Sequence, residues 1–231
     1  MKTTTQEDVL AKEGMARRSF LKFAGAGAIA AGVVATASSC QKHDGVVSDP
    51  TAIDLGTGDL AVLNYAYALE QLEAAFYTQV ISSPYANIST TERNYLTDIR
   101  DHEVAHREFF KAALAGNAIA ALTPNFSKIN FADRTSVLSY AKAFEDLGVA
   151  AYNGAGYLIK SADYLTLAGK IVSVEARHAA LIRTLLGIAI EEDTIVSVSG
   201  DGLELSQTPQ KVLDQANQFL SGKPLIAPNL M

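Results

Sequence analysis

Three features are scarce in this sequence: cysteine, clustered basic residues and long apolar runs. Cys40 is the only cysteine, which excludes a disulfide bond within the chain. No run of basic residues occurs beyond the N-terminus, and the net charge is −6, so we expect no nucleic-acid partner. The Gly/Ala-rich apolar run at 23–37 is too short and too weakly apolar to predict a membrane span.

The first 39 residues have the pattern of an export signal. Residues 17–22 read RRSFLK and resemble a twin-arginine signal, although Ala16 stands where Ser is usual. Residues 37–40 read ASSC and resemble a lipoprotein cleavage box, with Ala where Leu is commoner. We expect cleavage after residue 39, lipidation of Cys40, and a periplasmic or cell-envelope protein held to the membrane by that lipid. An ordinary signal peptide that leaves a free cysteine is the alternative.

The residues that follow predict a tether and four long helices. Residues 40–58 are polar, with Gly, Pro, Asp and Ser, and we expect them to form a tether. Apolar residues then recur at helical spacing. The predicted helices run from about 59 to 80 with Asp59 as the N-cap, from the S-x-x-E capping box at 89–92 to near Gly116, from about 134 to 157, and from about 162 to 186 before Gly187.

The lengths of the connections predict how these helices are arranged. Short loops join the first helix to the second and the third to the fourth, whereas residues 117–133 are long enough to return along a helix. We therefore predict an all-α fold, an antiparallel four-helix bundle over 59–187 with one long crossover between helices 2 and 3. In the extension over 188–231 we expect a small hairpin turning at 199–202. We also expect a short helix from Pro209 to Gly222 that packs on the bundle through Val212, Ala216, Phe219 and Leu220.

Residues 102–106 read HEVAH, which matches the H-E-x-x-H motif of zinc peptidases. The chain repeats a different phrase, however. Residues 99–106 (IRDHEVAH) and 171–178 (IVSVEARH) share I-x-x-x-E-x-x-H, and Val174 takes the place of His102 in the second copy. Twelve Glu and four His predict about 0.2 E-x-x-H pairs by chance, and two are present. No third zinc ligand follows the motif, so the zinc peptidase is the less favoured alternative.

A second phrase repeats on the other two predicted helices. Residues 70–77 (EQLEAAFY) and 145–152 (EDLGVAAY) share E-x-L-x-x-A-x-Y. At 1.5 Å per residue, the glutamates of each helix pair lie at similar heights, about 15 to 20 Å from their shared turn. Buried carboxylates need a counter-charge, and bound divalent cations would meet that need. The repeated Glu and His residues, all on apolar stripes that face the core, are Glu70, Glu103, His106, Glu145, Glu175 and His178.

One Glu from each of two helices, with Glu-x-x-His from each of the other two, resembles the di-metal site of the ferritin-like superfamily. The resemblance covers about 59–187, near the bacterioferritin and rubrerythrin branches, and is closest to exported ferritin-like-domain proteins related to plant desiccation-related proteins. It implies that Glu103 and Glu175 bridge two metals, with two terminal pairs of ligands, Glu70 with His106 and Glu145 with His178. Tyr77 matches a tyrosine that lies beside the site in several members, and Tyr152 is its repeat equivalent.

This ligand set favours two iron or two manganese ions over metals that prefer thiolates. The resemblance implies redox chemistry on a small oxidant, O2 or H2O2: oxidation of ferrous iron, or peroxide removal of a catalase-like kind. The alternatives are a non-enzymatic, metal-stabilised envelope or stress protein and a bundle whose site has lost its metal. The resemblance also allows a homodimer, although no residue defines an interface. His102 is expected on the flank of the stripe, and Glu73, whose repeat equivalent is Gly148, beside the ligands or at the surface.

Overall fold

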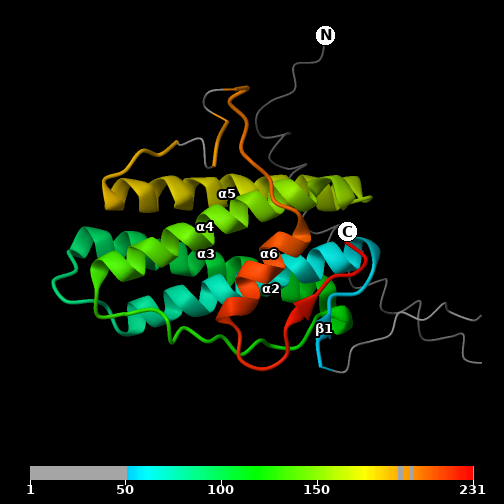
Figure 1. Cartoon of the computed structure of the whole chain (residues 1–231), viewed down its shortest axis with the longest axis horizontal. Coiled ribbons are helices and arrows are strands. Elements are labelled where there is room, and N and C mark those ends of the chain that lie inside the picture. Colours follow the sequence, from blue (N-terminus) through cyan, green and yellow to red (C-terminus); the bar gives the residue numbers. More distant parts are fainter. Residues whose placement is uncertain (1–50, 192–194, 198–199, 231) are drawn as a thin grey trace, which may run out of the picture.

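Four long helices lying side by side dominate the computed structural model, which describes residues 51–191, 195–197 and 200–230 (Figure 1). α2 packs chiefly on α3, and α4 chiefly on α5. The short connections make each of these pairs antiparallel, and the long link between α3 and α4 returns to the opposite end of the bundle. The predicted all-α bundle with a single crossover is therefore confirmed. The helices are α2 (Gly58–Ser82), α3 (Thr90–Leu114), α4 (Arg134–Ala155) and α5 (Ala162–Leu186), with 3-10 turns η2 (Ala115–Asn117) and η3 (Gly156–Leu158) after α3 and α4.

Local sequence signals set most of the helix ends. The Ser89 side chain accepts a hydrogen bond from the backbone N–H of Glu92, so the predicted capping residue of α3 is confirmed. Asp133 caps α4 in the same way, by accepting from the N–H of Ser136. Gly187, with a φ of 70°, ends α5 in the left-handed conformation that glycine adopts without steric cost.

The prediction of Asp59 as an N-cap was wrong. α2 begins at Gly58 with Thr57 as its N-cap residue, and the Thr57 side chain makes no capping hydrogen bond. The Asp59 carboxylate instead accepts hydrogen bonds from the backbone N–H groups of Lys160 and Ser161, at 2.8 and 2.9 Å. It therefore ties the turn between α4 and α5 to the start of α2, a contact between residues about a hundred positions apart that no local pattern reveals.

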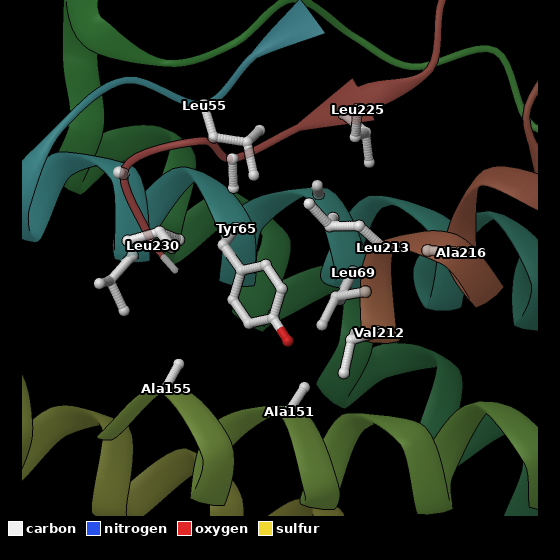
Figure 2. Close-up of a cluster of buried hydrophobic side chains, with 14 of the residues drawn as sticks. Leu55, Tyr65, Leu69, Ala151, Ala155, Val212, Leu213, Ala216, Leu225 and Leu230 are labelled. Carbon is white, nitrogen blue, oxygen red and sulfur yellow. The ribbon is translucent and has the colours of Figure 1, made fainter. Parts of the chain in front are cut away.

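Part of the segment expected to be a tether belongs to the fold. β1 (Ile53–Asp54) pairs in parallel with β2 (Leu225–Ile226), near the C-terminal end of the chain. Leu55 is fully buried with Leu213, Leu225 and Tyr65 (Figure 2). Transfer of its apolar side chain from water into this cluster lowers the free energy of the folded chain. The rest of the expected tether up to residue 50, the signal segment and Cys40 lie outside the described residues. Within the described residues, no helix has both the length and the apolarity needed to cross a bilayer.

The C-terminal extension covers one face of the bundle. Val196 pairs with Glu204 in an antiparallel bridge, as the predicted hairpin requires, although its Ser199 lies outside the described residues. α6 (Pro209–Ala216) and the 3-10 turn η4 (Asn217–Phe219) follow. Val212 and Ala216 are buried against α2 and α4, as the predicted apolar face requires. The Phe219 ring packs on Phe144 of α4, with ring centroids 4.8 Å apart.

A close backbone approach at Gly154 of α4 holds this extension in place. Gln207 donates its N–H to the Ala150 carbonyl, and a Cβ at position 154 would lie only 1.8 Å from the Gln207 carbonyl oxygen. We expect Gly154→Ala to push the segment off α4 and to lower the free energy of unfolding by about 1–3 kcal/mol. Gly169→Ala, on the open face of α5, should raise it by about 0.5–1 kcal/mol, because alanine favours the helix. Urea denaturation measures both values, and a stabilised Gly154→Ala protein would contradict the packing described.

Candidate metal centre

The structure brings all six predicted ligand residues together in the middle of the bundle. Each of the four helices contributes one glutamate, and α3 and α5 each add the histidine three residues later. A spacing of three places a Glu and a His on the same face of a helix. All four carboxylates are 0% exposed. The residues are Glu70 on α2, Glu103 and His106 on α3, Glu145 on α4, and Glu175 and His178 on α5.

Their side chains form two overlapping groups of potential ligand atoms. In each group, four residues offer one atom apiece, and these atoms all lie within 4.8 Å of one another. Glu103 and Glu175 belong to both groups, so they lie between the two positions, as bridging carboxylates would. Each group is completed by one more glutamate and one histidine: Glu70 and His106 in the first, Glu145 and His178 in the second.

The histidine nitrogens face the carboxylates at short range. His106 Nδ1 lies 3.0 Å from Glu175 Oε1 and 3.3 Å from Glu70 Oε2. His178 Nδ1 lies 2.8 Å from Glu103 Oε1. These contacts lack the alignment of hydrogen bonds, so both nitrogens and most of the carboxylate oxygens have no hydrogen-bond partner among the described residues. Buried polar atoms that converge without pairing are satisfied by a cation between them, so the residues present fit bound metal ions.

Without metal, the cluster balances its charges by holding protons. Burial raises the pKa of Glu70 well above its ordinary range and that of Glu145 to about 8. Burial also opposes charge on Glu103, but its contacts with His106 and His178 outweigh this effect and lower its pKa to about 2. For the two histidines, burial alone would lower the pKa, and the surrounding carboxylates instead raise it to about 12. Metal ions that bind here therefore displace protons.

The two predicted site tyrosines hold the outer carboxylates across the bundle. Tyr77 of α2 donates a hydrogen bond to Glu145 Oε1 on α4, and Tyr152 of α4 donates to Glu70 Oε1 on α2, each at 2.5 Å. Burial first, and then the neighbouring carboxylates, raise the pKa of both phenols well above 10. Both tyrosines therefore stay protonated and act as donors, and each fixes one oxygen of the glutamate that it contacts.

His102, the first histidine of HEVAH, contacts the other half of the centre. Its Nδ1 lies 2.9 Å from Nε2 of His178, and the two rings are nearly parallel, at 17°. Burial, followed by the neighbouring His178, lowers the pKa of His102, so a neutral His102 can accept the Nε2–H of His178. That hydrogen bond leaves Nδ1 of His178 facing the carboxylates as a ligand atom. His102 and His106 thus face different partners, whereas in a zinc peptidase both histidines would coordinate the same zinc ion.

Glu73 is a buried member of the cluster whose position the sequence left open, and its surface alternative was wrong. It is only 4% exposed, although it belongs to neither ligand group. Burial and the nearby carboxylates, with Glu103 foremost among them, raise its pKa well above its ordinary value. Gly148, the repeat equivalent of Glu73, makes room for it, because a Cβ at that position would lie 3.1 Å from Glu73 Oε1. The sequence signal for this burial lay in the repeat, where glycine at 148 stands opposite glutamate at 73 and leaves space for the larger side chain.

Glu73 should make the stability of the metal-free protein depend on pH. Its folded pKa lies above the ordinary value of 4.5, so above that pH the folded state keeps a proton that the unfolded chain has lost. The free energy of unfolding therefore falls as the pH rises from about 4.5 toward the folded pKa. We expect Glu73→Gln to remove this loss and to be more stable than the native protein by about 1 kcal/mol or more near pH 8.

Urea denaturation of the metal-free proteins across this pH range measures the difference. Glu108→Gln serves as the matched control, because Glu108 is an exposed glutamate on α3 outside the cluster. Parallel stability curves for Glu73→Gln and the native protein would contradict the raised pKa.

Comparison with models of protein families gives a match. A family model described as Ferritin-like domain matches residues 58–188, from the first residue of α2 to just beyond α5. The matched region covers more than half of the chain and contains all six residues of the two groups. No curated protein matches the chain.

Proposed function

The chain belongs to the family of ferritin-like domains, and on that premise we propose that it binds two iron or manganese ions for redox chemistry with O2 or hydrogen peroxide. The observation that carries the proposal is the pair of overlapping ligand groups that share Glu103 and Glu175, in which most of the converging atoms have no hydrogen-bond partner among the described residues. Two dications would balance the four carboxylates of these groups, and the family match supports a metal-binding role for the same helices.

The chemistry of the ligands favours iron or manganese. Oxygen and imidazole ligands suit these ions, and neither group contains a thiolate. Each group offers four protein atoms, whereas both metals accept octahedral coordination, so positions remain for an oxidant. When bound, the two ions would each supply one electron: together with two protons these convert O2 to hydrogen peroxide, or hydrogen peroxide to two water molecules. The protein holds the outer carboxylates through Tyr77 and Tyr152 and buries all four ligand carboxylates.

A structural role for the metal is the second candidate. All four helices contribute a buried carboxylate to the same cluster, so bound ions would cross-link the whole bundle. The protein would then be a metal-stabilised envelope or stress protein without turnover. In either case we propose, from the sequence, that residues 1–39 are an export signal and that a lipid on Cys40 holds the bundle at a membrane of the cell envelope.

Elemental analysis tests the site. After loading with ferrous iron or manganese, we expect about two ions per chain. Glu103→Ala and Glu175→Ala should each lose most of this metal, because each change removes a ligand from both groups. Glu108→Ala, an exposed control on α3, should keep it. One zinc per chain that survives Glu175→Ala but not His102→Ala would contradict the proposal and favour the peptidase motif.

Turnover separates the redox role from the structural role. We expect the metal-loaded protein to consume O2 or hydrogen peroxide faster than the same metal in buffer, measured by an oxygen electrode and by peroxide decay. Bound metal should also stabilise the fold in both cases, by about 2.7 kcal/mol at a hundredfold excess over the dissociation constant. Metal-dependent stabilisation without consumption of either oxidant would refute the redox role and support the structural one.

A further inference from the structure

An apolar pocket lies inside the bundle, toward the end where α2 begins and α3 ends. Its volume is about 30 Å³, and its lining is almost wholly apolar. Phe110 and Ala66 are buried, whereas Phe109, Tyr164 and Ala168 are only half-buried, so the pocket extends toward the surface. All four helices contribute to its walls, through residues that include Ala66, Phe109, Phe110, Tyr152, Tyr164 and Ala168.

The inner end of this pocket lies next to the metal centre, although none of the six ligand residues lines it. Ala66 lies one helical turn before Glu70 on α2, and Phe110 lies one turn after His106 on α3, so each shares a helix face with a ligand residue. Four residues rise about 6 Å along the helix axis. Tyr152 both lines the pocket and donates its hydroxyl to Glu70. The pocket therefore adjoins the half of the centre formed by Glu70 and His106.

The size and polarity of the pocket select its occupant. A single water needs roughly 10–15 Å³ of such space, so a molecule with two heavy atoms fits and an acyl chain does not. Water and hydrogen peroxide need several hydrogen-bond partners, and each unpaired group carries a free-energy cost. The Tyr152 hydroxyl is already given to Glu70, which leaves the Tyr65 hydroxyl as a buried lining group without a partner among the described residues. An apolar diatomic molecule requires no hydrogen-bond partner.

Two other pockets differ from this one. The pocket beside Glu73 and Gly148 has a volume of only about 10 Å³, enough for a single water. A wider pocket of about 360 Å³ lies between the α4–α5 pair and the C-terminal extension, and charged residues such as Lys142, Asp146 and Glu204 line it. Among the described residues, neither of these pockets is lined by a residue that donates a hydrogen bond to a ligand glutamate, as Tyr152 of the apolar pocket does.

We propose that the apolar pocket admits and holds O2 beside Glu70 and His106, which makes O2 rather than hydrogen peroxide the oxidant of this centre. The inference rests on the proposed redox function and narrows it to one substrate. The chemistry would be that given above: two bound M²⁺ ions would each supply one electron to O2, which with two protons would become hydrogen peroxide. Dry apolar cavities of this kind bind xenon, which reports on the pocket independently of any metal.

The first test is a xenon-pressurised crystal of the full protein. We expect xenon in the apolar pocket of the native protein. Ala168→Phe should exclude it, because the ring fills the space beside Tyr164. Ala180→Phe is the matched control on the same helix, since Ala180 lines the wider pocket instead. If the phenylalanine variant does not fold, Ala168→Leu places a smaller side chain in the same pocket. A native pocket that takes up no xenon would overturn the proposal.

The second test compares the two oxidants by stopped-flow measurements on the iron-loaded proteins. Ala168→Phe should slow oxidation by O2 roughly tenfold, equivalent to a barrier about 1.4 kcal/mol higher, and leave metal content and the rate with hydrogen peroxide unchanged. Ala180→Phe should change neither rate. Equal slowing with both oxidants, or with neither, would overturn the O2 pocket while the redox function stands. Xenon binding in a native protein whose metal reacts with hydrogen peroxide but not with O2 would overturn the O2 role and leave the redox function standing, whereas reaction with neither oxidant would refute both.

Discussion

The burial of four carboxylates and two imidazoles at the middle of the bundle is the constraint on which the rest of the structure depends. A buried carboxylate is tolerated only when a proton, a cation or a hydrogen bond compensates its charge. The histidines, the two tyrosines and the raised pKa values of Glu70 and Glu145 supply that compensation in the metal-free protein. Metal ions would replace the protons, so metal affinity and the stability of the fold are linked.

The two halves of the centre follow an internal repeat, and their differences are as informative as their likeness. The ligands and the crossed contacts of Tyr77 and Tyr152 obey the repeat. Glu73 and His102 do not, since their repeat equivalents are Gly148 and Val174. His102 supports the half that contains His178, whereas the apolar pocket adjoins the half that contains His106. The two positions therefore differ in their surroundings although their ligands match.

The segments outside the four helices hold the bundle together at its surface. β1 and β2 join residues from the two ends of the described chain, and Gly154 allows the backbone at Gln207 to lie directly on α4. The Asp59 carboxylate links the start of α2 to the turn before α5. These contacts lie near the end of the bundle that contains the apolar pocket, so they help to fix the helix spacing that keeps the pocket open.

The sequence by itself determined the four helices, most of their ends, the single crossover and the six residues that meet at the centre. These features follow from local rules, because helical periodicity and capping act within a few residues and the repeat placed Glu103 and Glu175 on matching faces. Only the tertiary structure decided the partner of Asp59, the pairing of Ile53 with Leu225, the burial of Glu73 and the contact of His102 with His178. Each of these features depends on how separate elements pack. The residues that meet are far apart in the chain, and no local sequence pattern predicts which of them will come into contact.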